Sequence, residues 1–250
     1  MKARMQNFLP WFDVLAILAW GILLLKYWLT GKLNLLIHPN YFGLTVAAGI
    51  WLLLIGGLKA WQLLKNSNRS KNPSLGHISL FPPGWSSALL LTTAIIGLIV
   101  TPRVFNSQIA LDRGIGEAAI SSRAKPQAFR SVVRPEERSL IEWVRTLHVY
   151  PEPDAYTGKK VKIDGFVVYP PELPPEYVLI SRFVITCCAA DAYPVGLPVK
   201  LDQDRTAFSP DTWLEVEGQM ITETIAGKRQ LIVQAKSLKK IPTPENPYYY

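Results

Sequence analysis

The sequence is poor in charge, in histidine and in cysteine. Charged residues make up 18% of its 250 residues, against about 25% in an ordinary soluble domain, which argues against a soluble enzyme. The two cysteines, Cys187 and Cys188, are adjacent, which excludes a disulfide framework and a CxxC zinc module. The three histidines are scattered, and the chain contains no Ser-His-Asp set, phosphate-binding loop or pair of catalytic acids with defined spacing. The sequence therefore predicts no enzyme.

Acidic residues are nearly absent from residues 1–103. This part contains nine Lys or Arg residues and one acid, Asp13, whereas residues 104–250 contain eighteen of each sign. The whole net charge of +8 therefore belongs to the first part, which is also the apolar one. Positive charge beside apolar segments is typical of membrane orientation and not of phosphate recognition. We expect a transmembrane region over 1–103 and no nucleic-acid partner.

Long apolar segments predict two to three membrane-spanning helices, over residues 11–29, 41–58 and, as a third, 85–101. Aromatic side chains lie at the ends of these segments, as interfacial anchors do. The first segment is too long for a cleavable signal, and no small-residue cleavage site follows it. We therefore expect it to remain as an anchor.

Positive charges beside these segments predict their orientation. Only Lys26 and Lys32 flank the first connection, whereas six basic residues flank the amino terminus and the second connection: Lys2, Arg4, Lys59, Lys65, Arg69 and Lys71. The side with more positive charge faces the cytoplasm. The prediction is a multi-pass protein of the cell membrane with a cytoplasmic amino terminus and an extracytoplasmic carboxyl-terminal domain.

The second half begins with a connection, residues 104–134, that has room for one short helix. Pro135 is expected to open a longer helix, because proline suits a first helical position. An apolar stripe follows at helical spacing, formed by Leu140, Trp143, Val144 and Leu147. This helix is expected to cap a β-domain, so that the helix and the β-domain together span residues 135–241.

From Lys160 the apolar pattern changes to a period of two, which predicts β-strands. The expected strands cover residues 160–167, 178–186, 196–201, 214–222 and 231–238, with a hairpin turn at residues 226–229. Five short strands in about eighty residues favour a small OB-like five-stranded β-barrel. Residues 242–250 are expected to form an extended tail.

Cys187, Cys188 and Asp191 are the candidate metal ligands. Adjacent residues on a strand point to opposite faces, so both thiols can bind one metal only if the backbone bends, which the two alanines after Cys188 allow. His148 would add a nitrogen if the capping helix packs nearby. This ligand set suits zinc, and two thiolates also suit copper. Core packing of the thiols and a strained vicinal disulfide remain alternatives. Arg182 could pair with an acid or an anionic ligand, but a solvated arginine or one paired with Asp191 is expected.

Four runs of the chain carry a resemblance to a known family: residues 158–161, 165–167, 181–192 and 211–218. The third run contains Arg-Phe-Val-Ile-Thr-Cys-Cys-Ala-Ala-Asp. Together with the amino-terminal apolar segments and His38-Pro39, these runs resemble a family of bacterial membrane proteins of unknown function. The family is described as one subunit of a two-component membrane permease complex. The resemblance implies a larger polytopic permease subunit as partner, and it leaves the substrate open.

The sequence thus predicts an accessory subunit of a membrane permease. Its extracytoplasmic β-domain would bind or gate for a polytopic partner, because spans with so few polar groups do not make a pore by themselves. The alternative is a stand-alone, membrane-anchored metal-binding or thiol-redox protein.

Overall fold

The structure is a computed structural model that describes residues 2–65, 84–115 and 134–250, with side chains described from residue 10 onward. The chain divides into two compact units, Met1–Arg103 and Val104–Tyr250. Arg69 and Lys71, which carry part of the predicted orientation, lie outside the described ranges. Residues 116–133 of the predicted connection lie outside them as well.

The described residues of the first unit form three helices, α1 (Lys2–Leu29), α2 (Phe42–Lys65) and α3 (Trp85–Ile99). The short 3-10 turns η1 (Lys32–Leu35) and η2 (Pro39–Tyr41) lie between α1 and α2. Two stretches, Pro10–Leu29 and Pro39–Lys65, are long and apolar enough to cross a membrane. The third predicted span contains the shorter helix α3, of 15 residues. Helix α2 continues beyond the predicted end at Leu58, because Lys and Gln favour helix even where they end the apolar run.

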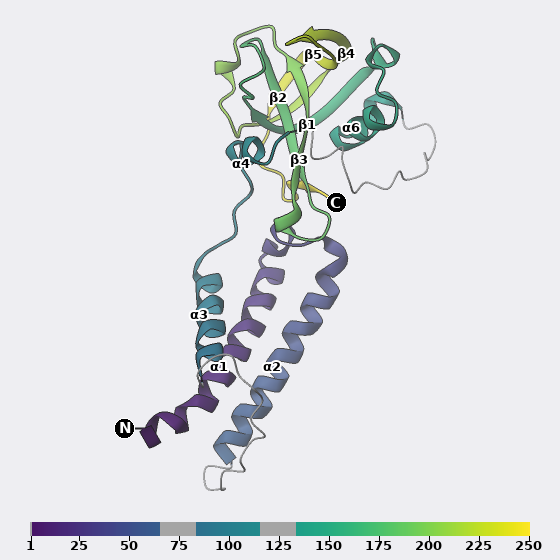
Figure 1. Cartoon of the computed structure of the whole chain (residues 1–250). Coiled ribbons are helices and arrows are strands. Elements are labelled where there is room, and N and C mark those ends of the chain that lie inside the picture. The colour runs from purple at the N-terminus through teal and green to yellow at the C-terminus, as the bar shows by residue number, and fades with distance from the viewer. Residues whose placement is uncertain (1, 66–83, 116–133) are drawn as a thin grey trace. The chain divides into compact units, whose positions relative to one another are not determined.

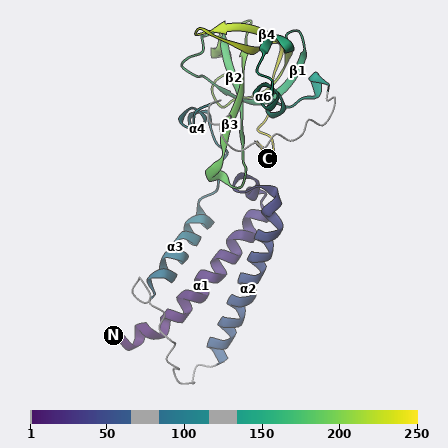
Figure 2. The same ribbon diagram turned by 45° about the vertical axis from the view of Figure 1, so that its right-hand side comes forward.

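Helix α1 lies between α2 and α3 (Figures 1 and 2). A Cβ added at Gly49 or Gly56 of α2 would lie 3.1 or 2.6 Å from a leucine side chain of α1, so glycine allows the two backbones to approach closely. Helix α3 runs in the same direction as α1. Near the start of α3, Ser87 donates a hydrogen bond to Asp13 in the first half of α1. Near their ends, Lys26 Nζ donates to the carbonyl of Leu98 over 2.6 Å.

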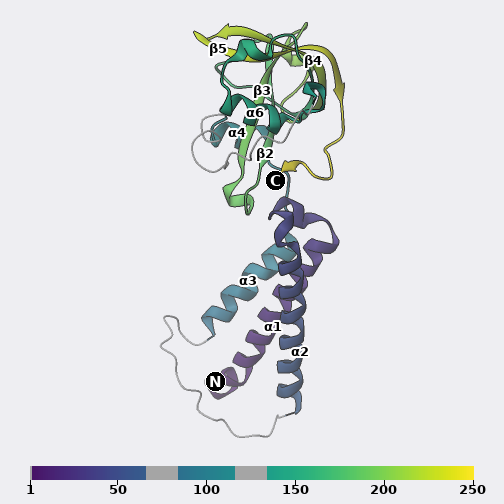
Figure 3. The ribbon, with the colours of Figure 1, turned by 90° about the vertical axis from the view of Figure 1, so that its right-hand side faces the viewer.

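The second unit contains a six-stranded mixed sheet with strand order β1-β4-β5-β3-β2-β6, in which β1 also pairs with β2. Its strands are β1 (Lys160–Val168), β2 (Tyr177–Val184), β3 (Tyr193–Lys200), β4 (Trp213–Ile225), β5 (Lys228–Lys240) and β6 (Tyr248–Tyr249). The β3–β5 and β2–β6 pairs are parallel, and the other pairs are antiparallel. The β4–β5 hairpin is the longest pairing, and Figure 3 shows it curving along the domain.

The sheet has a sixth strand where the sequence predicted five strands and an extended tail. Strand β6 lies within the predicted tail, residues 242–250, and pairs with the end of β2. Two residues are too few for an alternating pattern, so this strand depends on the edge that β2 offers. Strand β3 begins at Tyr193 and not at residue 196, despite Pro194. It pairs with β5 only at Val199 and Lys200, so most of its length tolerates proline on that side.

The capping helix starts later than predicted. Pro135 opens only a 3-10 turn, η3 (Pro135–Glu137), and α6 spans Leu140–Val149. Ser139 and Glu142 form a capping box, in which each side chain accepts from the backbone N–H of the other residue. The predicted apolar stripe is confirmed, because Leu140 and Trp143 are fully buried in the core of the domain. The connection contains the predicted short helix, α4 (Ser107–Asp112).

Candidate metal centre

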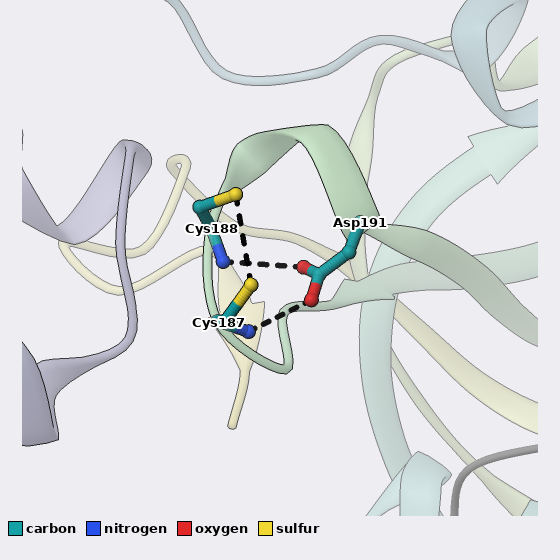
Figure 4. Close-up of side chains that lie close together, drawn as sticks. All are labelled: Cys187, Cys188 and Asp191. Atoms are coloured by element: carbon teal, nitrogen blue, oxygen red, sulfur yellow. Dashed lines mark hydrogen bonds between the residues drawn. The ribbon is translucent and has the colours of Figure 1, made fainter.

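The cysteine pair lies in the loop that joins β2 to β3. Strand β2 ends at Val184, Cys187 is exposed and Cys188 is half-buried. The next residues, Ala189–Asp191, form the 3-10 turn η5. Because the backbone bends here, the two adjacent side chains do not point to opposite faces, and their Sγ atoms lie 3.7 Å apart (Figure 4).

The carboxylate of Asp191 closes this bend. Its Oδ1 accepts from the backbone N–H groups of Thr186 (3.3 Å) and Cys188 (3.2 Å), and its Oδ2 accepts from that of Cys187 (2.9 Å). The Asp191 N–H in turn donates to the Cys188 carbonyl over 3.1 Å. Cys188 and Asp191 therefore have the spacing and the reciprocal contacts of a capping box around a single 3-10 turn.

These contacts set the protonation of the loop. The hydrogen bond to the Asp191 carboxylate, together with a weaker one to Cys188, raises the pKa of the Cys187 thiol to about 11. Burial acts to raise the pKa of Asp191, but hydrogen bonds from the Cys187 thiol and from three backbone N–H groups outweigh it and lower that pKa. At neutral pH Asp191 is therefore ionised and Cys187 is a protonated thiol. A metal would have to displace the thiol proton.

The structure brings three of the four predicted ligands together. One ligand atom from each of Cys187, Cys188 and Asp191 lies within 4.8 Å of the other two. Both cysteines are free thiols. His148 is not part of this group and is exposed near the end of α6. Over the described parts of the chain, the candidate site thus consists of two sulfurs and a carboxylate at the surface.

Arg182 has a different role from the one predicted. It is only 8% exposed, so it is not solvated, and it pairs with Asp164 over 3.0 Å instead of with Asp191. The pairing of β1 with β2 brings Asp164 within reach, which the sequence does not reveal. Its other contacts hold the end of the chain and the face of β4: the carbonyls of Asn246 and Pro247 and the rings of Trp213 and Tyr249. Arg182 is therefore an anchor for the residues before β6.

Two sets of hydrogen bonds that support the cysteine loop were not predicted from the sequence. Arg113, directly after α4, donates hydrogen bonds to the carbonyls of Ala189 and Ala192. On the other side, the N–H of Ile185 donates to the carbonyl of Tyr249 in β6 over 2.9 Å. The sequence contains no pattern that pairs Arg113 or the chain end with this loop. The Cys188-x-x-Asp191 spacing was the available signal for the turn itself.

Comparison with known families covers both units. The DUF1980 N-terminal domain matches residues 12–116, and the DUF1980 C-terminal domain matches residues 123–250. No curated protein matches the chain. The C-terminal match contains the whole sheet and the cysteine loop, so the candidate site lies within a family domain.

Proposed function

Since the chain belongs to the DUF1980 family, whose two domain names state no activity, we propose its function from its own geometry. It is an accessory subunit of a membrane permease. Its β-domain binds a ligand, or gates, for a polytopic partner subunit.

The outer surface of the helices is the observation that carries this proposal. Large apolar side chains are exposed along α2, among them Leu44 (72%), Trp51 (64%) and Leu58 (57%). Polar groups of α1 and α3 are instead paired with one another, as in the Asp13–Ser87 contact. The described helices therefore offer an apolar surface for lipid or another membrane subunit, and little polar surface to line a path for a solute.

The proposed location is the cell membrane, multi-pass, with a cytoplasmic amino terminus and an extracytoplasmic β-domain. The parallel course of α1 and α3 supports it, because a chain that crosses three times has its first and third spans in the same direction. Helix α3 rises about 22 Å, less than the roughly 30 Å of a hydrocarbon core.

An OB-like five-stranded barrel is the proposed architecture of the β-domain. The cycle of pairings β1-β4-β5-β3-β2-β1 supports it, because each of these five strands has two neighbours. Strand β6 would then be an addition at the edge of β2. Closed barrels of this kind commonly bind their ligands through loops and one sheet face.

Purification in mild detergent tests the accessory role. We expect the tagged full-length chain, expressed with a polytopic permease subunit, to elute with that subunit in a constant ratio. Expression of the tag on an unrelated three-span protein is the control. A chain that elutes as a monomer and transports a solute into liposomes without a partner would contradict the proposal.

A second candidate function is favoured by the cysteine loop. Three ligand atoms within 4.8 Å of one another suit a membrane-anchored metal-binding or thiol-redox protein that acts by itself. Elemental analysis and thiol titration of the full-length protein, as isolated and after reduction, test this function. Bound metal, or fewer than two titratable thiols before reduction, would support it. Two free thiols that bind no added metal would contradict this function. Core packing of the thiols, the third alternative of the sequence, is wrong, because Cys187 is exposed and Cys188 is only half-buried.

A further inference from the structure

We propose that Cys187, Cys188 and Asp191 form a three-ligand, exchangeable site for a tetrahedral divalent metal ion of the zinc class, with its fourth position open to an incoming ligand. This inference rests on the metal-binding candidate above and names its cargo. It goes beyond that candidate by specifying the charge and the coordination geometry of the ion. It also makes the site one that passes the ion on, and not a structural site that stabilises the fold.

The spacing of the sulfurs matches tetrahedral coordination. Two thiolates on a tetrahedral zinc, with bonds of about 2.3 Å, lie about 3.8 Å apart. The Sγ atoms of Cys187 and Cys188 lie 3.7 Å apart. Copper(I) often binds two thiolates in a linear arrangement. The two sulfurs would then lie two bond lengths apart, at more than about 4 Å. The loop therefore holds its sulfurs at the edge of a tetrahedron.

Asp191 keeps one oxygen position for a metal while it orders the loop. Its Oδ1 already accepts two backbone hydrogen bonds, from Thr186 and Cys188. Its Oδ2 accepts one backbone hydrogen bond, from Cys187. A carboxylate oxygen has room for two partners, so the carboxylate has a position for the ion once the Cys187 thiol, which donates to it in the metal-free protein, has lost its proton. The same carboxylate can thus close the turn and bind the ion.

The charge of the loop favours a divalent ion. Two thiolates and a carboxylate carry three negative charges, which a divalent ion reduces to one and a monovalent ion only to two. The guanidinium of Arg113 donates to the carbonyls of Ala189 and Ala192 of the same loop and supplies one positive charge nearby. With a divalent ion the net charge of the three ligands, the ion and Arg113 is zero. A neutral site has the smallest desolvation cost in free energy when it is partly buried.

The fourth position is open. Structural zinc sites are closed by four protein ligands, whereas sites that exchange a ligand have three. Among the described residues, no fourth His, Cys, Asp or Glu joins the group, and Cys187 is exposed. Arg113 and the Ile185–Tyr249 backbone hydrogen bond hold the loop from within the domain. The loop that carries the ligands is therefore supported before an ion arrives, on a surface that a partner or a small ligand can reach.

Cobalt(II) substitution of the full-length protein in detergent tests the proposal. We expect one cobalt per chain, with the strong visible bands of tetrahedral cobalt and a thiolate-to-cobalt charge-transfer band. Zinc(II), added without any other ligand, should displace the cobalt and so remove these bands. Added imidazole should shift them, because it can take the open position. Weak octahedral bands, a stoichiometry that does not depend on the thiols, or a tetrahedral spectrum that imidazole leaves unchanged would each overturn the proposal.

Matched variants assign the ligands. Cys187→Ser and Cys188→Ser should each weaken zinc binding at least about a hundredfold, more than the loss of an outer-shell partner. Asp191→Asn should also weaken it, whereas Asp204→Asn should not. Asp204 also accepts a backbone hydrogen bond at a 3-10 turn, as the N-cap of η6 (Arg205–Ala207) through the Thr206 N–H, whereas Asp191 is the last residue of η5, and no cysteine lies beside Asp204. Equal effects of the two Asp→Asn changes would overturn the assignment of Asp191.

Two further measurements separate this proposal from the others. Alkylation of both thiols in the wild-type protein should abolish the cobalt bands, and this result does not depend on whether a variant folds. Co-purification with the permease subunit is measured on the same samples. If the full-length protein does not bind cobalt but still co-purifies with the permease subunit, the metal-site proposal is contradicted and the accessory role is not. Cobalt binding without co-purification contradicts the accessory role and leaves the metal site in place.

Discussion

At the scale of single residues, Asp191 has two effects on the cysteine loop. Its carboxylate accepts three backbone hydrogen bonds and so holds the bend on which the proximity of the two thiols depends. The same carboxylate accepts a hydrogen bond from the neighbouring thiol, which opposes its ionisation and raises the pKa of Cys187 to about 11. Structure and reactivity of the loop are therefore linked through one side chain.

Asp191→Asn should make Cys187 more reactive in metal-free protein. Without the carboxylate, the pKa of the thiol should return toward its ordinary value, and the thiolate fraction at pH 8 should rise by roughly a hundredfold. Because a less basic thiolate is also a weaker nucleophile, we expect the rate of alkylation to rise by about tenfold. Alkylation by iodoacetamide between pH 7 and 10, followed by mass spectrometry, measures it. An unchanged rate, or an equal rise in Asp204→Asn, would contradict this explanation.

Arg182 is the second residue with a defined prediction. Arg182→Lys would weaken the contact of Nη1 with both oxygens of Asp164, and it would lose two hydrogen bonds to chain carbonyls and the stacking on Tyr249. The free energy of unfolding should fall by about 2–3 kcal/mol. Arg229→Lys is the matched control, because the ion pairs of Arg229 with Glu152 and Asp154 are exposed. Chemical unfolding followed by tryptophan fluorescence measures both, and similar losses would refute the anchoring role.

At the scale of elements, the β4–β5 hairpin depends on a two-residue turn. Ala226 and Gly227 both have positive φ, 50° and 75°, as a type I′ turn requires. The predicted turn over residues 226–229 was longer, because Lys228 and Arg229 look like turn residues although they already belong to β5. The pairing of β4 with β5 therefore continues up to Ile225 and Lys228, the two residues that flank this turn.

Opposite effects are expected from two changes in this turn. Gly227→Ala should lower the stability of the domain by about 1 kcal/mol, because alanine is strained at positive φ. Ala226→Asn should raise it by about 0.5–1 kcal/mol, because Asn-Gly is the preferred type I′ pair. Thermal unfolding followed by circular dichroism measures both changes. A loss of stability in both variants would show that the turn has a different conformation.

At the scale of the whole molecule, the number of membrane crossings decides the side on which the cysteine loop lies. With three crossings, reporter fusions at Asn68 and after Tyr250 should report opposite sides of the membrane, with Asn68 in the cytoplasm. A fusion at Lys32, in the first connection, is the control for the outer side. If Asn68 and Tyr250 report the same side, the segment 85–101 does not cross and the β-domain is cytoplasmic.

The regular elements of this protein could be read from the sequence with few errors. Apolar runs and alternation are local signals, and they located α1, α2, the stripe of α6 and the five long strands. The errors lie where a local signal is weak or misleading. Pro135 resembled a helix start, but the Ser139–Glu142 capping box fixes the beginning of α6. Strand β6 has only two residues and no pattern of its own.

The sequence by itself determined which residues could carry chemistry, because Cys187, Cys188 and Asp191 are close together along the chain. Only the tertiary structure decided their arrangement. The 3.7 Å between the sulfurs depends on the bend that Asp191 closes. The exclusion of His148 from the group and the pairing of Arg182 with Asp164 depend on contacts between elements far apart in sequence. Arg113 and Tyr249, which hold the loop, lie 74 and 62 positions away from Cys187, a separation over which composition and periodicity contain no signal.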